Sequence, residues 1–129
     1  MPAIATLAIN DGQATPVSHN FDPVTTDGSL AKWADRSPTI PNGYRTIQLE
    51  VSPPAGTRIT NKWQAGFNNP TVATIDGSDT VVRNSSGQVT LNIHPESTLQ
   101  ERKDLLAYMA NFLANASVKT SEQNLEPFY

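Results

Sequence analysis

The chain has 129 residues, no cysteine and a formal net charge of −3 at pH 7. Its length predicts one domain, and the missing cysteines exclude a disulfide framework and a thiolate metal site. We find neither an apolar run of the roughly 18 residues that a membrane span needs nor a secretory signal, so we expect a soluble protein made inside a cell. The net negative charge argues against a nucleic-acid-binding protein, although residues 32–83 carry six basic and only four acidic side chains.

The first 28 residues predict a hairpin followed by a loop. Residues 4–9 and 13–21 resemble strands, and Asp11-Gly12 between them suits the positive φ of a tight turn. Pro16 has no backbone N–H to donate to a neighbouring strand, so we expect the second strand to be an edge strand or bulged. Residues 21–28 predict a loop.

Four further segments predict the strands of an antiparallel sheet, namely residues 29–35, 44–52, 58–67 and 87–93. In the second of them, Ile47, Leu49 and Val51 alternate with polar residues. Such alternation over several strands is typical of a sheet with one buried face and one solvated face. The polar positions carry amides and hydroxyls but few charges, whereas a surface that serves solubility alone is ordinarily richer in Lys and Glu.

Two connecting segments separate these strands. Residues 36–44 contain two prolines and end in Asn42-Gly43, which indicates a turn. Residues 68–87 show no clear periodicity and predict a long loop, and such loops in compact domains are usually functional or mobile.

Residues 97–117 form the one segment with a plain helical period. Ser97 or Thr98 supplies the N-cap of a capping box, and the apolar side chains that follow line two adjacent ridges. A last short turn of helix is expected at 120–125, with Thr120 or Ser121 as its cap. Strands followed by helices predict an α+β fold in which the helices cover the apolar face of a sheet. The pattern leaves open whether that sheet belongs to the same chain or to a partner.

No pattern in the sequence predicts catalysis, a metal site or a cofactor, and we do not expect an enzyme. His19 and His94 are the only histidines, and neither has partners at the spacing of metal ligands. Gly-rich phosphate loops, nucleophile elbows and paired carboxylates are also missing. We interpret Trp33 and Trp63 as core or interface anchors rather than ligand platforms.

Several short motifs occur in an order that matches a known family. They are Gly28-x-x-Ala31-x-Trp33, Asn69-Pro70-Thr71, the helix start from Ser97 to Arg102, and the terminal aromatic Tyr129. In this order and spacing, the chain resembles the coat proteins of single-stranded RNA bacteriophages, the levivirus group, over nearly its whole length.

The resemblance implies one coat protein domain over residues 1–129, with a hairpin in 1–21, a sheet in 29–93 and C-terminal helices in 97–129. In the family, two subunits pair their antiparallel sheets edge to edge, and the helices of each chain cross over the partner's sheet. The dimer contacts implied here are Leu105, Leu106, Met109, Phe112 and Leu113. Such homodimers build the icosahedral capsid of the virion in the cytoplasm of the bacterial host, with genomic RNA and the phage maturation protein as further partners.

In the family, the polar face of the sheet lines the capsid interior and binds a hairpin of the genomic RNA, which represses replicase translation and favours packaging. The resemblance assigns this RNA contact to Leu30, Arg45, Thr46, Gln48, Glu50, Lys62, Gln64, Asn84, Ser86, Gln88 and Thr90. Amides and hydroxyls can hydrogen-bond base edges, and basic side chains pair with phosphates. Two positions depart from the family pattern, because Glu50 replaces a small hydroxyl residue and Gly66 replaces a polar one.

The segment 68–87 corresponds to the longest loop of the family, which gathers around the symmetry axes of the capsid. The resemblance implies that Asp76, Gly77, Ser78 and Asp79 form this capsid-axis loop. The chain lacks the cysteines that crosslink this loop in some relatives, and an ordinary surface loop is the alternative interpretation.

Two other functions compete with a hairpin-binding coat protein. One is a small β-sheet module that grips a sugar or peptide between Trp33 and Trp63 and is a stable monomer. The other is a coat protein that has lost specific hairpin binding and packages RNA without sequence preference.

Overall fold

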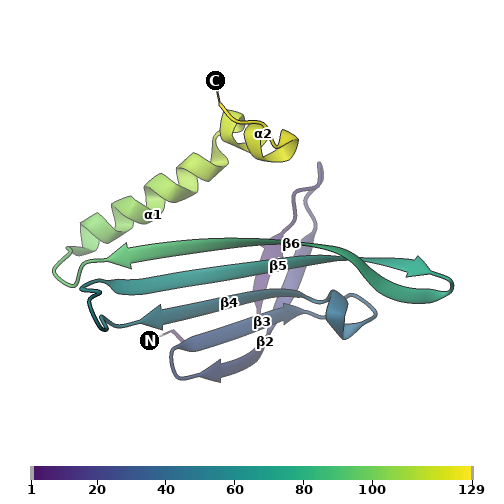
Figure 1. Ribbon diagram of the computed structural model, residues 1–129, viewed down its shortest axis with the longest axis horizontal. Coiled ribbons are helices and arrows are strands. Elements are labelled where there is room, and N and C mark those ends of the chain that lie inside the picture. Colours follow the sequence, from purple (N-terminus) through teal and green to yellow (C-terminus); the bar gives the residue numbers. More distant parts are fainter. Residues whose placement is uncertain (1, 129) are drawn as a thin grey trace. The chain divides into compact units, whose positions relative to one another are not determined.

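The computed structural model describes residues 2–128. Contacts divide the chain into two compact units, residues up to 92 and residues from 93 onward. The first unit holds a sheet with the strand order β1-β2-β3-β4-β5-β6, in which every strand neighbours the next one along the chain (Figure 1). The strands are β1 (Leu7–Asn10), β2 (Ser18–Asp27), β3 (Leu30–Asp35), β4 (Arg45–Ser52), β5 (Asn61–Ile75) and β6 (Ser78–Ile93). The α+β fold class predicted from the sequence is confirmed.

The predicted hairpin is present as β1 and β2, but its turn and its end differ from the prediction. The expected tight turn at Asp11-Gly12 is wrong: residues 11–17 form a longer loop, and Gly12 is not among the glycines with positive φ. The Asp11 carboxylate shapes this loop, because its Oδ1 accepts hydrogen bonds from the backbone N–H of Gln13 (3.2 Å) and of Val17 (3.0 Å). Pro16 therefore lies in the loop and not in a strand.

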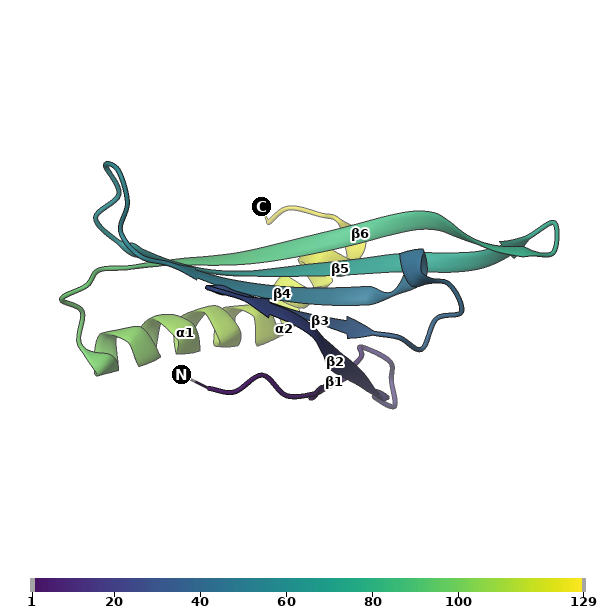
Figure 2. The ribbon, with the colours of Figure 1, turned by 90° about the horizontal axis from the view of Figure 1, so that it is seen from below.

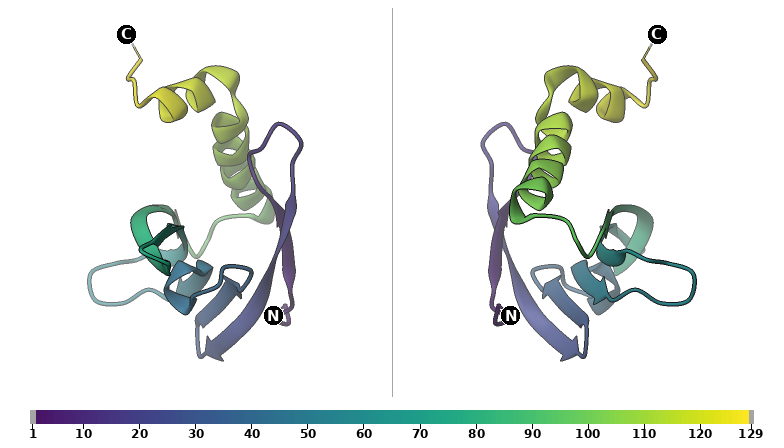
Figure 3. Two further views of the ribbon diagram at one scale, coloured as in Figure 1. Left: turned by 90° about the vertical axis from the view of Figure 1, so that its right-hand side faces the viewer. Right: turned by 90° about the vertical axis from the view of Figure 1, so that its left-hand side faces the viewer.

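The prediction of a loop at 21–28 is also wrong, because β2 continues to Asp27 and pairs with β3. The pairing register shifts between Pro23 and Thr25, which is a bulge at the point where proline has no N–H to donate. Bulges bend a strand and increase its twist. Figure 3 shows β2 bending away from the plane of β3 and β4 towards the hairpin loop.

The long loop predicted at 68–87 is wrong as well, because this segment forms the far halves of β5 and β6. Asp76 (φ 51°) and Gly77 (φ 80°) connect the two strands in a two-residue turn, and positive φ at both positions is typical of a type I′ hairpin. Residues 82–88 are all exposed, so no buried face imposes an alternating pattern there. β4, β5 and β6 form one twisted layer (Figure 2).

The core of the first unit lies on one face of the sheet, around Phe21, Trp33 and Ile47. Ile4, Ala31 and Leu49 pack against this cluster and are partly buried. The indole N–H of Trp33 donates to the backbone carbonyl of Ala5 at 2.9 Å, which fastens the segment before β1 to β3. A 3₁₀ turn, η1 (Pro41–Gly43), lies in the connection between β3 and β4, and the turn predicted at 36–44 is confirmed.

The second unit contains α1 (Leu99–Ala114) and α2 (Ala116–Asn124). Thr98 caps α1: its side chain accepts from the Glu101 N–H (3.2 Å), and the Glu101 carboxylate accepts from the Thr98 N–H (2.8 Å). The predicted capping box is confirmed with Thr98, not Ser97, as the cap. The prediction of a short helix at 120–125 is wrong in its start, because Asn115 accepts from the N–H groups of Ser117 and Val118 and starts α2 earlier.

Neither helix buries a residue within the chain. In the part of the chain that the structure describes, no helix combines the length and the apolar character needed to cross a membrane.

Candidate functional site on the polar face of the sheet

The polar side chains of β4 share one face of the sheet, because successive residues of a strand point to opposite sides. Thr46, Gln48 and Glu50 lie on this face, whereas Ile47 and Leu49 lie on the other and belong to the core. We call the face that carries Thr46, Gln48 and Glu50 the polar face.

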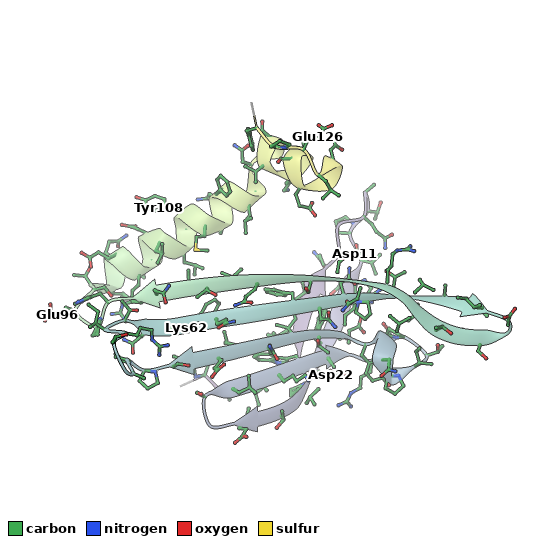
Figure 4. All side chains as sticks on the ribbon, in the orientation of Figure 1. Asp11, Asp22, Lys62, Glu96, Tyr108 and Glu126 are labelled. Carbon is green, nitrogen blue, oxygen red and sulfur yellow. The ribbon has the colours of Figure 1, made fainter. Side chains whose placement is uncertain are left out.

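Strand pairing extends the polar face from β4 over β3 and β5. Directly paired residues present their side chains to the same side of a sheet. The paired sets across these strands are Leu30–Glu50–Gln64, Lys32–Gln48–Gly66, Ala34–Thr46–Asn68 and Ser52–Lys62. Six of the residues assigned to RNA contact therefore stand in adjacent rows, with Lys62 towards one end of β5 (Figure 4).

A shallow hollow opens on the polar face and joins four strands. Its lining residues are Lys32, Thr46, Gln48, Gly66, Phe67, Asn68, Ser86, Gly87 and Gln88. The hollow extends from Thr46 and Gln48 of β4 across β5 to Ser86 and Gln88 of β6, so it unites four of the residues assigned to RNA contact. Its side chains include one amine, two hydroxyls and three amides, and none of the described lining residues carries a carboxylate.

The absence of a side chain at Gly66 provides room for the Gln48 side chain. A Cβ atom at Gly66 would lie 3.3 Å from Gln48 Cγ and 3.4 Å from Gln48 Nε2, which is tighter than most contacts of a real side chain. The family pattern has a polar residue where this chain has Gly66. Because Gly66 has no side chain, the Gln48 amide can lie over β5 at this point.

The remaining assigned residues on β6 are less closely grouped. Gln88 Nε2 donates to Thr90 Oγ1 at 3.3 Å, so Thr90 stands next to the hollow. Asn84 lies on β6 with an exposed side chain and is not part of the lining.

Arg45 differs from the other assigned residues because it lies on the opposite face of β4. Its Nη1 donates to Asp35 Oδ2 at 2.8 Å, and its Nε donates to Asn69 Oδ1 at 3.3 Å. Asp35 is only 3% exposed, so Arg45 is committed to a buried carboxylate. Its placement directs its charge away from Gln48 and the hollow.

Sequence reasoning missed two polar side chains of the hollow, those of Lys32 and Asn68. Both carry side chains suited to RNA contact, but only the register places them there, opposite Gln48 and Thr46. Strand patterns show which face a residue occupies and not which residue of the next strand it meets.

The turn between β5 and β6 is tied to the connection between β3 and β4. Asp79 Oδ1 accepts from the Thr74 hydroxyl at 2.7 Å, and Asp79 Oδ2 accepts from the Thr39 hydroxyl. The hydrogen bonds from Thr39 and then Thr74 hold the pKa of the Asp79 carboxyl below its ordinary value. Of the predicted capsid-axis residues, Asp76 and Gly77 form the turn, and Ser78 and Asp79 begin β6.

A family model described as levivirus coat protein matches residues 2–129. The chain belongs to the levivirus coat protein family. It is a structural capsid protein of an RNA phage.

Individual relatives of this coat protein agree with the family match. The capsid protein of Enterobacteria phage SP is 31% identical over 91 residues, which cover 70% of this chain and 69% of that protein. The virus-like particle of bacteriophage NT-214 contains a chain with a TM-score of 0.88 and 26% identity, and the match covers 99% of this chain and 100% of that one. The capsid protein of bacteriophage GA shares the fold with a TM-score of 0.74, at 13% identity and 97% coverage of both chains.

The family match and the structure decide against the ligand-binding module. Trp33 is 8% exposed and its indole N–H is already bonded to Ala5, so it offers no platform for a ligand. The interpretation of Trp33 as a core anchor is confirmed.

The five residues of α1 assigned to the dimer lie on a helix whose apolar side chains remain exposed in the single coat protein chain. Leu106 is 54% exposed, Phe112 62% and Leu113 56%. Leu105 is also exposed, and Met109 is half-buried.

Proposed function

We propose that this coat protein forms homodimers that assemble into an icosahedral capsid and bind hairpins of the genomic RNA on the polar face. The observation that carries the RNA proposal is the hollow, whose lining combines amides and hydroxyls of β4, β5 and β6 with the Lys32 amine of β3. The virus-like particles formed by its relatives support the capsid.

The exposed side of α1 supports the dimer. Full burial of a Leu, Phe or Met side chain contributes roughly 1.5–3 kcal/mol. A helix of this length is marginal in water without such packing. We infer that Leu105, Leu106, Met109, Phe112 and Leu113 pack on the sheet of a second copy, and that folding and dimerisation are coupled.

The chemistry of the polar face supports RNA as its ligand. The amides of Gln48, Asn68 and Gln88 can each donate and accept, as recognition of a base edge requires. Lys32 and Lys62 supply positive charge on the same face for the phosphates. Glu50 repels phosphates, but its carboxylate can accept from the amino group of a base.

We extend the proposal to the biology that follows from such binding. Occupation of a genomic hairpin represses translation of the replicase and marks the RNA for packaging, and the capsid takes up the maturation protein with the RNA in the host cytoplasm. The turn of Asp76, Gly77, Ser78 and Asp79 is proposed to gather at the symmetry axes of the capsid.

RNA binding is tested by measuring the affinity of purified coat protein for hairpins tiled from the phage genome and for scrambled hairpins of equal length. Gln48→Ala removes a proposed base contact. We therefore expect it to lower the affinity for the best genomic hairpin by about 10–100-fold and the affinity for the scrambled hairpins much less. Lys62→Ala removes a proposed phosphate contact. We therefore expect it to lower the affinity for both RNAs to a similar extent and to make binding depend less on salt concentration.

Lys119→Ala on α2 is the matched control for the loss of a lysine, and we expect it to bind both RNAs as the unaltered protein does. Unchanged affinity in both Gln48→Ala and Lys62→Ala would contradict RNA binding at the polar face. Equal affinity of the unaltered protein for genomic and scrambled hairpins would favour packaging without sequence preference.

A further inference from the structure

The hairpin of β5 and β6 continues past the last residue that β4 reaches (Figure 1). Pairing between β4 and β5 ends at Thr46 and Asn68, whereas β5 runs on to Ile75. We call residues 69–84, which form the free end of this hairpin, the distal hairpin. A two-stranded hairpin alone is marginally stable in water, and within the described residues 69–84 only Pro70 is buried. The direction of the distal hairpin therefore depends on what supports it from the side.

The connection between β3 and β4, residues 36–44, lies against the base of the distal hairpin. Arg45, which follows this connection, donates from Nε to Asn69 Oδ1 at 3.3 Å. Gly43 is buried, and a Cβ atom there would overlap Val72 Cγ2. These contacts hold the distal hairpin as far as Val72. Its outer part, residues 73–80, lies beyond them.

The connection between β3 and β4 is a stiff support. Pro38 and Pro41 stand on either side of Thr39 and Ile40, and the ring of a proline fixes its φ angle. The N–H of Gly43 donates to the carbonyl of Ile40 at 3.0 Å, which closes the turn that follows. Thr39 is therefore carried by a backbone with little conformational freedom.

Asp79 joins the outer part of the distal hairpin to this support. The two-residue turn at 76 and 77 places Asp79 opposite Thr74. Asp79 Oδ1 accepts from the Thr74 hydroxyl at 2.7 Å, and Asp79 Oδ2 accepts from the Thr39 hydroxyl. One carboxylate therefore bridges both strands of the hairpin and the β3–β4 connection. Among the described residues, its bond with Thr39 is the only side-chain hydrogen bond between residues 73–80 and that connection.

The bond with Thr39 goes beyond what the turn itself requires. An aspartate that only stabilises the turn needs a partner on the opposite strand, and Thr74 is that partner. Thr39 belongs to a different segment, 40 residues earlier in the chain, and its side chain is exposed. Water can replace an exposed hydrogen bond at modest cost. The bond therefore holds the outer part less permanently than the close contact of Gly43 with Val72 holds the base.

We propose that Asp79 is a positioning residue for capsid assembly, because its hydrogen bond with Thr39 sets the direction in which the turn of β5 and β6 leaves the sheet. This inference rests on the proposed role of that turn at the symmetry axes of the capsid. Contacts around a symmetry axis repeat in every copy, so the direction of the turn affects the angle between neighbouring copies. A turn that Asp79 holds in one direction favours one capsid size, and a turn without this bond permits several.

Hydrogen–deuterium exchange of the full-length coat protein tests whether Thr39 and Asp79 hold the outer part. Thr39→Val removes the donating hydroxyl and keeps the shape of the side chain, so we expect the protection of residues 73–80 relative to β4 to fall about two- to ten-fold. Thr80→Val is the matched control, because the described hydrogen bond of its hydroxyl, at 3.5 Å, is to the Ser78 carbonyl of its own strand. Equal protection in Thr39→Val and the unaltered protein would overturn the proposal.

Electron microscopy of the expressed particles tests the effect on assembly. We expect one particle diameter for the unaltered protein and for Thr80→Val, and several diameters or no particles for Thr39→Val and Asp79→Ala, at a melting temperature equal to that of Thr80→Val. Particles of one unchanged diameter from both variants, or lost particles together with a lowered melting temperature, would overturn the positioning role. Failure of the unaltered protein to form particles would instead contradict the proposed capsid itself.

Discussion

Gly43 illustrates how one missing atom shapes the sheet. It is a buried residue at the end of η1, where the connection from β3 packs against β5. A Cβ atom on Gly43 would overlap Val72 Cγ2 on β5 and would also touch Pro38 and Ile40. Valine is branched at Cβ and has few alternative rotamers, so it has little freedom to move aside. Glycine at this position allows the 36–44 connection to lie close to β5.

Gly43→Ala should therefore lower the free energy of unfolding by about 1–3 kcal/mol, the usual cost of adding a methyl group to a well-packed site. Urea denaturation followed by fluorescence measures the change. Gly12→Ala is the matched control, because a Cβ there meets no heavy atom within 4 Å and its φ is not positive. Equal stabilities of the two variants would show that Val72 moves aside without a measurable loss of stability.

The N-terminal end of α1 carries a local signal that decides where the helix begins. For α1 this signal is the reciprocal pair of Thr98 and Glu101, which satisfies two backbone N–H groups that would otherwise lack partners. Ser97 was an equal candidate from the sequence, but its hydroxyl donates to the His94 carbonyl at 2.7 Å and shapes the preceding turn instead. The cap is thus decided by the path of the chain before the helix.

Thr98→Ala should destabilise the coat protein by about 1 kcal/mol through loss of the N-cap, whereas Thr98→Ser keeps the accepting oxygen and should retain most of the stability. Thermal denaturation monitored by circular dichroism separates these cases. A Thr98→Ser variant as unstable as Thr98→Ala would mean that the threonine methyl group, not the cap, is important.

The element-scale errors in the prediction have a common cause. β5 and β6 extend through residues 68–87 because each provides the other's backbone hydrogen bonds, while the exposure of residues 82–88 removes the alternating pattern that sequence reasoning relies on. β2 likewise continues past Pro23, because the pairing resumes after a bulge at the point where proline has no N–H to donate. In both places, pairing with a neighbouring strand outweighs the local preference.

At the scale of the whole molecule, the apolar side chains of α1 are exposed in the single chain, as the proposed packing on a second copy requires. Monomeric proteins rarely expose so many large apolar side chains together, and such a surface usually marks an interface. The tip of Asp76 and Gly77 is a further surface, and its proposed role needs the assembled capsid.

Leu113→Asp should prevent dimerisation and capsid formation, because it places a charge in the proposed interface. Light scattering after size exclusion measures the mass in solution, and electron microscopy of the expressed protein shows whether capsids form. Asn111→Asp adds the same charge to the polar side of the same helix and should assemble normally. Intact capsids from Leu113→Asp would contradict packing of α1 on a partner.

The sequence by itself determined the α+β class, the one-sided sheet, the capped amphipathic helix and the family. These features depend on periodicity and on short motifs, which neighbouring residues carry within one segment. The assignment of Thr46, Gln48 and Glu50 to one face follows from the same period of two.

Only the tertiary structure decided which strands meet and in which register. It placed Lys32 and Asn68 in the hollow and turned Arg45 to the opposite face towards Asp35. The physical reason is that a one-residue slip in pairing exchanges the two faces of a strand, and the partner strand and the buried contacts set that register. Local sequence carries the periodicity of each strand, and long-range packing decides which side chains share a site.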